Sequence, residues 1–331
     1  MHHYLYDCKE KKFTLKWLNA RIKNFDYGHY EAAAKPSKLK EDHLLENDNS
    51  TKLNQSASQM WLLATILPMI LGPLIDKNDE YYDNFLNVLE ICRMAFSIDT
   101  EKWMVVSLQD AIERYLINYQ LLYGDLIPKQ HNLTHYPSWI LAVGSLVNYM
   151  CMRCDGKHRY FKKLVNVIGC YKNIPLTLTE KHQLSQAAAW SKSLIKAPSC
   201  GPHSVVMRKD FMYRSVVDHS VEKIIETTWL ISDGIKFRPE KSYICIGHDD
   251  NSFPVFAKIV KVLLYPNIQF ICNNVKTVML NYNLAAYQIT VLEDGSVYST
   301  NSMLLHSVFN VHTVNGDKYI AVRCSGGGVI F

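Results

Sequence analysis

Residues 286–324 read AYQITVLEDGSVYSTNSMLLHSVFNVHTVNGDKYIAVRC, and this stretch decides the fold class. Short runs rich in Val, Ile, Tyr and Phe alternate in it with turn-forming residues. Such side chains favour the pleated, half-buried surface of a β-strand. Asp294-Gly295 and Asn315-Gly316 fall between apolar runs, and these dipeptides are typical of two-residue hairpin turns. The stretch therefore predicts antiparallel strands joined by tight turns.

The same pattern begins upstream of this stretch. Strands are expected at residues 243–246, 256–264, 268–272, 286–292, 297–300, 309–314 and 319–324. Several short strands with tight turns are typical of a small antiparallel β-barrel. We therefore predict a β-rich, barrel-like domain over residues 216–331.

The first 200 residues have a helical period instead. Apolar residues recur at spacings of three and four, as Leu15, Leu18 and Ile22 do. Helices are expected at residues 13–25, 59–71, 81–96, 100–123, 139–151, 157–168 and 179–196. Asp79 is placed to cap the start of one helix, and Gly169 to end another. The predicted fold class is α+β, with a helical region over residues 1–200.

Two segments interrupt these patterns. Residues 36–58 are polar and contain the turn-forming run from Asn47 to Ser50, which predicts a flexible linker. Pro198, Gly201 and Pro202 mark the change from helical to strand period, so residues 201–215 are expected to be a joint. Two separable domains follow from this division.

Net charge, cysteine content and hydrophobicity limit the partners and the cellular compartment expected for this protein. A net charge of +5 permits a nucleic-acid partner without requiring one. Nine irregularly spaced cysteines and no signal peptide favour a reducing compartment, with the cysteines as small core residues. Residues 60–75 carry no charge, but they are shorter than the ~20 residues of a spanning helix. We expect a buried core helix there and no membrane contact.

Chemistry-bearing residues concentrate between residues 129 and 173. His131 and His135, with Cys151 and Cys154, have the pair spacings of a zinc site. The cysteines, however, end a helical apolar run and have no turn residues between them, so packing thiols are the favoured interpretation. We expect no bound zinc and no other metal.

A carboxylate and a basic patch form the second candidate site. Asp155 and His158 lie close together in sequence, beside a run of cations at Arg153, Lys157, Arg159, Lys162 and Lys163. Phosphodiester chemistry needs carboxylates to hold Mg²⁺ and cations to hold phosphate. Alternatively, Asp155 caps the following helix and the lysines form its solvated face. The spacing alone leaves both interpretations open.

The chain resembles the C-terminal half of CACTA-type transposases of animal genomes. Those proteins carry, in order, His-x3-His-Tyr-Pro, Gly-Pro-Leu, Met-Arg-Phe-Glu-x-Lys-His-x2-Phe-Lys, Phe-Lys-Asn-Ile and Thr-Leu-x3-His-Gln. The matching residues here are His131, His135, Tyr136, Pro137, Gly144, Leu146, Met152, Arg153, Lys157, His158, Phe161, Lys162, Lys172, Asn173, Ile174, Thr177, Leu178, His182 and Gln183. Residues 13–28, 55–72, 253–263 and 285–289 also resemble family segments, so the resemblance covers nearly the whole chain.

The resemblance implies a partial RNase H-like core with a helical insertion, and an Asp-Asp-Glu metal site. Asp155 stands where the family has the Glu of its motif, and Cys154 stands where it has Phe. The family's earlier acids have no matching motif here. The expected protein is transposon-derived, nuclear, DNA-binding or assembling with itself, and catalytically inactive. No cofactor is expected, and Mg²⁺ only if activity remains. Two alternatives are a protein- or chromatin-interaction module and a nuclease completed by a partner chain.

Overall fold

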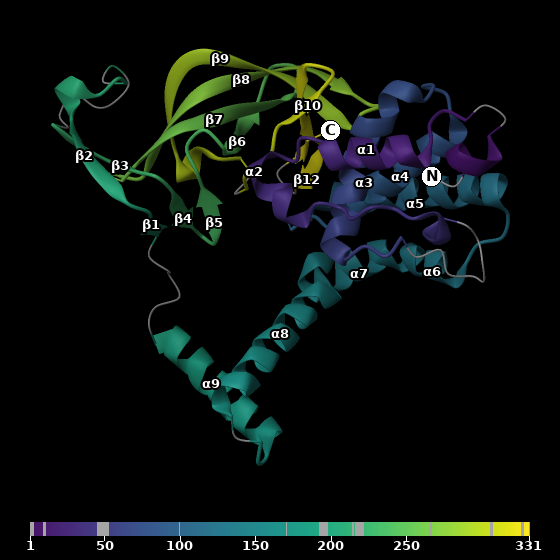
Figure 1. The fold of residues 1–331 in the computed structure, drawn as a ribbon, viewed down its shortest axis with the longest axis horizontal. Helices are drawn as coiled ribbons and strands as arrows, with labels where there is room; N and C mark the ends of the chain where they lie inside the picture. The colour runs from purple at the N-terminus through teal and green to yellow at the C-terminus, as the bar shows by residue number, and fades with distance from the viewer. Residues whose placement is uncertain are drawn as a thin grey trace.

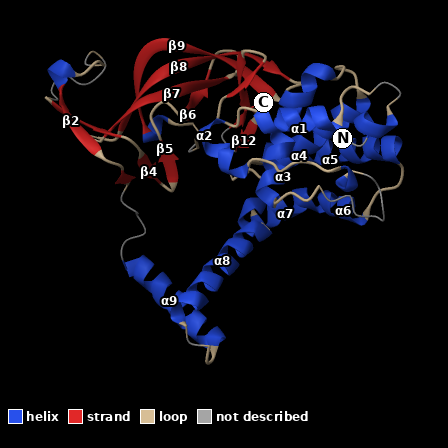
Figure 2. Ribbon diagram, in the orientation of Figure 1, coloured by secondary structure: helices blue, strands red, loops and turns tan. Residues whose placement is uncertain are grey.

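The computed structural model describes residues 3–8, 11–44, 53–98, 100–169, 171–191, 198–213, 215, 222–264, 267–304, 307–325 and 328–330. Helices gather on one side of the molecule and strands on the other, as Figure 2 shows. Two further helices project from the helical side and form an arm below the body (Figure 1). The α+β class is therefore confirmed.

The helices follow the apolar period of the sequence. They are α1 (Leu15–Asn24), α2 (Gly28–Glu31), α3 (Ala57–Leu71), α4 (Glu80–Ala95), α5 (Lys102–Tyr123), α6 (Pro128–His131), α7 (Tyr136–Val143), α8 (Cys151–Ile168) and α9 (Ile174–Ser191). Short π or 3-10 turns are η1 (His3–Asp7), η2 (Ala32–Ala34), η3 (Glu41–His43), η4 (Gly72–Leu74), η5 (Asn132–His135), η6 (Leu146–Tyr149), η7 (Arg208–Asp210) and η8 (Thr300–Ser302). Asp79 caps α4 as predicted, accepting the Tyr82 N–H at 2.9 Å.

Helix α3 is the central apolar helix. Eight of its fifteen residues are buried, including Ile66 and Met69, which are fully enclosed. Among the described residues, α3 with η4 is the one helical segment long and apolar enough to span a membrane, and half of it is buried inside the protein. Its burial is consistent with the predicted core helix.

The predicted linker at residues 36–58 packs on the helical lobe where it is described. Leu39 and Leu44 are buried in the same core as α1 and α3. Gln55 joins the two ends of the segment, because its side chain accepts the Ser37 N–H and donates to the Ser37 carbonyl. Residues 36–40 and 53–56 are a loop that packs on the helical lobe, and residues 45–52 lie outside the described residues, so the flexibility of the segment stays a prediction.

The strands form one large, curled antiparallel sheet and two small sheets of three and two strands. They are β1 (Ser199–Cys200), β2 (His203–Met207), β3 (Lys223–Thr227), β4 (Leu230–Ser232), β5 (Ile235–Phe237), β6 (Tyr243–His248), β7 (Pro254–Leu263), β8 (Gln269–Asn281), β9 (Ala286–Ser299), β10 (His312–Val314), β11 (Asp317–Ala321), β12 (Arg323–Ser325) and β13 (Gly328–Ile330). The main sheet has the order β10-β11-β9-β8-β7-β3-β2, with β6 also paired to β7. Its edge strands β10 and β2 do not pair, so the sheet is a half-barrel. The predicted closed barrel is corrected, because a barrel requires its edges to meet.

One of the two predicted hairpin turns is confirmed and one is wrong. Asn315 and Gly316 have φ angles of 53° and 93° and join β10 to β11, as a two-residue turn requires. Asp294-Gly295 instead lies inside β9, at a bulge where residues 292–294 stand opposite Asn274 of β8. The Asp294 carboxylate accepts the Asn274 N–H at 3.2 Å and its side-chain amide at 2.9 Å. These bonds hold the polar pair within one continuous strand.

The segment predicted as a joint is part of the sheet. Residues 201–215 contain β2 and η7, and β2 pairs with β3 through five residue pairs. The strand lobe therefore starts before residue 216. Residues 192–197, between α9 and this lobe, lie outside the described residues.

The helical and strand lobes share a buried boundary. Met69 of α3 is buried in one cluster with Leu284, Tyr319 and other apolar residues of the strand lobe. The Tyr82 hydroxyl donates to the Asn283 carbonyl at 2.5 Å. At Gly72 the approach is so close that a Cβ would lie 2.5 Å from that same carbonyl oxygen. Glycine is required here for space.

We expect the fragment 216–331 to fold alone, with a lower Tm than the whole chain. Two hydrophobic clusters, around Phe256 and around Phe270, lie wholly within residues 230–322. The fragment nevertheless loses β2 and the contacts of Met69. Far-ultraviolet circular dichroism of the fragment should show strand structure with a cooperative thermal transition. A random-coil spectrum would contradict the two-domain prediction.

Candidate nucleic-acid interface

The arm consists of α8, the turn that includes residues 171–173, and α9. Helix α8 leaves the body beside α7, and α9 turns back from its far end (Figure 1). Gly169 ends α8 as predicted, because its φ of 63° is left-handed and its N–H donates to the Val165 carbonyl. None of the arm's described side chains is buried, so the arm is held by contacts between its own two helices.

One contact between the helices involves a residue of the sequence motif. His182 of α9 packs edge-on against Phe161 of α8, with ring centroids 5.4 Å apart, and lies 5.9 Å from the ring of Tyr160. Phe161, Leu164, Val165 and Ile168 are half-buried on the predicted apolar face. The motif residues Phe161 and His182 therefore join α8 to α9.

Four of the five cations predicted to contact DNA are described, and all four are exposed on α8. Lys157, Arg159, Lys162 and Lys163 are exposed, and His158 is exposed beside them. Within the described part of the chain, none of the four cations is paired with a carboxylate. From Cys151 to Ser191 the sequence has seven Lys and Arg residues against two acids. The arm therefore carries a positive charge that neighbouring side chains leave largely uncompensated.

Asp155 and Arg153 lie in the first turns of α8. The helix begins at Cys151, after an extended Met150, so Asp155 is inside it. The N-cap interpretation of Asp155 is therefore wrong, because a cap residue precedes the first helical turn. The side chains of Asp155, Arg153 and Cys154 lie outside the described residues.

His131 and His135 are brought together, as their spacing predicts. Their Nε2 atoms are 3.2 Å apart, and the ring of His135 also lies 5.7 Å from that of Trp139. His182 belongs to the arm instead. Across the described residues, no three His, Cys, Asp or Glu side chains come close enough to share a metal ion. The described residues thus do not form the carboxylate cluster that Mg²⁺ needs, and the expected absence of zinc stays a prediction.

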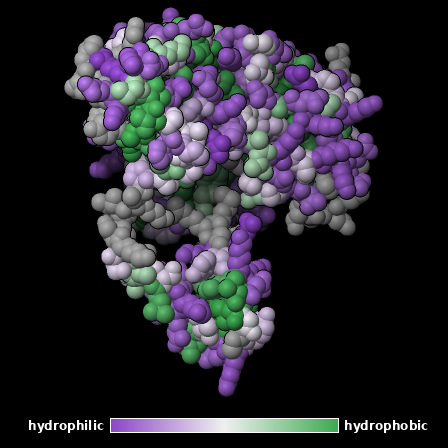
Figure 3. Space-filling model, turned by 60° about the vertical axis from the view of Figure 1, so that its left-hand side comes forward, coloured by the Kyte–Doolittle hydropathy of each residue, from purple (hydrophilic) through white to green (hydrophobic). Residues whose placement is uncertain are grey.

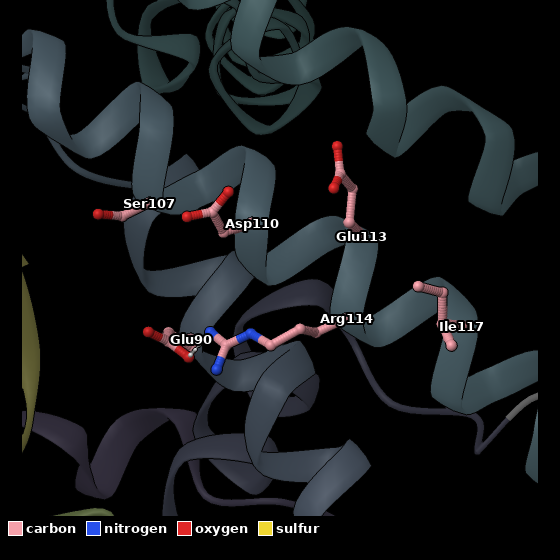
Figure 4. Close-up of a pocket in the computed structure, with 6 residues that line it drawn as sticks. All are labelled: Glu90, Ser107, Asp110, Glu113, Arg114 and Ile117. Carbon is pink, nitrogen blue, oxygen red and sulfur yellow. Dashed lines mark ion pairs between the residues drawn. The ribbon is translucent and has the colours of Figure 1, made fainter.

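An acidic hollow on the helical lobe was not predicted from the sequence. It has a volume of about 580 Å³ and lies between α4 and α5. Its lining residues are Glu90, Ser107, Asp110, Glu113, Arg114 and Ile117 (Figure 4). Arg114 Nη2 lies 3.6 Å from Glu90 Oε2, which leaves the other two carboxylates without a cation in the hollow. The carboxylates make this face unfavourable for a phosphate backbone.

Comparison with protein-family models, with curated proteins and with solved structures finds no match to this chain.

Proposed function

We propose that the chain is derived from a CACTA-type transposase, contacts DNA through its arm, and does not itself cut DNA. The observation that carries the proposal is that Lys157, Arg159, Lys162 and Lys163 are exposed on α8 and that none of them pairs with a carboxylate among the described residues. Non-specific affinity for DNA comes from cations that replace condensed counterions on the phosphates. A projecting helix reaches a phosphate backbone without interference from the acidic hollow.

The motif residues add support from the sequence. Lys157, His158 and Lys162 match the family motif and lie along one exposed stretch of helix. The helical lobe has no strand among its described residues. Of an RNase H-like core, this chain would therefore contain only helices. Nuclear location and self-association are parts of the same proposal.

We expect the purified chain to bind duplex DNA without sequence preference. Four phosphate contacts through α8 give a log–log dependence on salt with a slope of about −3.6, at about 0.9 per contact. Fluorescence anisotropy of a labelled random duplex between 50 and 200 mM salt measures this slope. An affinity that does not change with salt would contradict the proposal.

We expect no DNA cleavage or strand transfer by this chain alone. Two-metal phosphoryl transfer needs several carboxylates around metals about 3.5–4 Å apart. Of this chain's acids, Asp155 alone stands in a motif of the family. The assay is nicking and strand transfer on supercoiled plasmid with Mg²⁺ and Mn²⁺, beside Asp155→Ala and Asp155→Glu. Activity that the Ala variant loses would make Asp155 catalytic and overturn this part of the proposal.

A second candidate function is binding of a peptide at the sheet edge. Strand β2 is an edge strand, and its Val205 and Met207 side chains are 60% and 41% exposed. An extended peptide can add to such an edge through main-chain hydrogen bonds. Binding of this kind depends little on salt, which separates it from the electrostatic contact proposed for α8.

A further inference from the structure

Aromatic side chains on the arm are exposed beside its cations. Tyr171 at the tip is 66% exposed, Trp190 near the end of α9 is 67% exposed, and Tyr160 on α8 is 38% exposed. Figure 3 shows hydrophobic and hydrophilic surface side by side on the arm. Tyr171 and Trp190 are left largely uncovered by the arm, and Tyr160 is partly covered by Phe161 and His182, so part of each ring is available to a ligand.

Tyr160 lies between two lysines on one side of α8. Lys157 and Lys163 are three residues before and after it, and residues three apart are neighbours on a helix. Lys157 Nζ lies 5.8 Å from the centroid of the Tyr160 ring. The face of the Tyr160 ring can stack on a base, and the flanking lysine ammonium groups can bind the phosphates next to that base.

The three rings are spread along the arm. Tyr160 lies eight residues before the end of α8, about 12 Å along the helix axis at ~1.5 Å per residue. Trp190 lies sixteen residues after the start of α9, about 24 Å along that axis. Rings at such separations do not stack on one another, but several bases of one strand can each reach a different ring.

Resting on the proposed function, we propose that the arm binds single-stranded DNA, with bases stacked on Tyr160, Tyr171 and Trp190 and phosphates on the α8 cations. In a duplex the bases are already stacked on one another and do not reach these rings. A protein partner fits the arm less well, because interfaces between proteins are depleted of Lys. The combination of a basic surface with separate aromatic platforms is typical of single-strand binding.

The test compares three probes of twelve units: oligo-dT, a duplex, and a deoxyribose-phosphate strand without bases. On charge alone the duplex would bind best, because it has twice the phosphates. We expect oligo-dT to bind at least about fivefold more tightly than the duplex and at least about 20-fold more tightly than the baseless strand. The Tyr171→Ala, Trp190→Ala double variant should lose at least about tenfold in oligo-dT affinity and leave the baseless strand unchanged. Tyr282→Ala removes a 77% exposed tyrosine outside the arm and should change nothing.

The outcomes separate this inference from the proposed function. Equal affinity for oligo-dT and the baseless strand would overturn base stacking but leave electrostatic DNA contact standing. No binding to any of the three probes would overturn both. Light scattering tests whether the exposed rings bind a second copy of the chain instead of DNA. If the native protein is a dimer and the double variant is a monomer, the rings form a dimer interface, and the inference is overturned.

Discussion

Replacement of Lys157, Arg159, Lys162 and Lys163 together by Ala is expected to reduce duplex DNA affinity more than about 100-fold at 50 mM salt. The slope of log affinity against log salt should become shallower by about 3.6, because each lost phosphate contact contributes about 0.9. These side chains are exposed, so the circular dichroism spectrum and Tm should be nearly unchanged. Anisotropy titrations at several salt concentrations measure both quantities.

A matched control removes the same net charge elsewhere. Lys38, Lys40, Lys276 and Lys318 are exposed and lie outside the arm. Their fourfold replacement by Ala should leave most of the affinity in place. If the two variants lose affinity equally, the effect is one of overall charge, and α8 is then only a solvated helix.

The second large effect is expected at the boundary between the lobes. Met69→Ala should reduce the free energy of unfolding by about 2–5 kcal/mol, because it leaves a cavity among rigid neighbours. Met69 is fully buried and packs in one cluster with Leu284 and Tyr319, which belong to the strand lobe. Met212→Ala is the control, since that side chain is 85% exposed and its loss should change stability by less than about 0.5 kcal/mol.

The measurement is urea unfolding followed by two probes. Five of the six tryptophans precede residue 200, so fluorescence reports mainly on the helical lobe. Far-ultraviolet circular dichroism also follows the strands. Loss of the Met69 side chain at the shared boundary should shift both the fluorescence and the circular dichroism transition to lower urea concentration. If fluorescence alone moves, or if the change stays below about 1 kcal/mol, the boundary does not couple the lobes.

Helices and turns were predicted correctly from the sequence where the apolar period, the capping residues and the turn residues all indicate the same element. The helix over residues 157–168 and its stop at Gly169 follow from an apolar period and a left-handed glycine. Its true start at Cys151 was missed, because residues 152–156 lack that period. The turn at Asn315-Gly316 was predicted from two residues. Asp233-Gly234 carries the same signal between β4 and β5, with φ angles of 50° and 80°, so that hairpin was readable too.

Features that depend on distant residues were not predictable in this way. Strand β9 continues through Asp294 because Asn274 on the neighbouring strand bonds its carboxylate, and register is needed to see that. The sheet stays open because β2 and β10 do not meet, which the strand count does not reveal. The acidic hollow joins Glu90 to residues 107–117 only after α4 packs on α5. The α8 cations, by contrast, were predicted because they are contiguous.

The close fit at Gly72 bears on how such a chain can diverge. Its φ of −51° is ordinary for any residue, so the polypeptide's conformational preferences impose nothing there. The constraint is the Asn283 carbonyl oxygen of the other lobe, 211 residues later, which occupies the place of a side chain. The substitutions tolerated at position 72 are therefore limited by the backbone at Asn283, far away in the sequence, and not by the residues next to Gly72 in the chain. A recombinant that exchanges one lobe for that of a distant relative would have to preserve this spacing between two backbones.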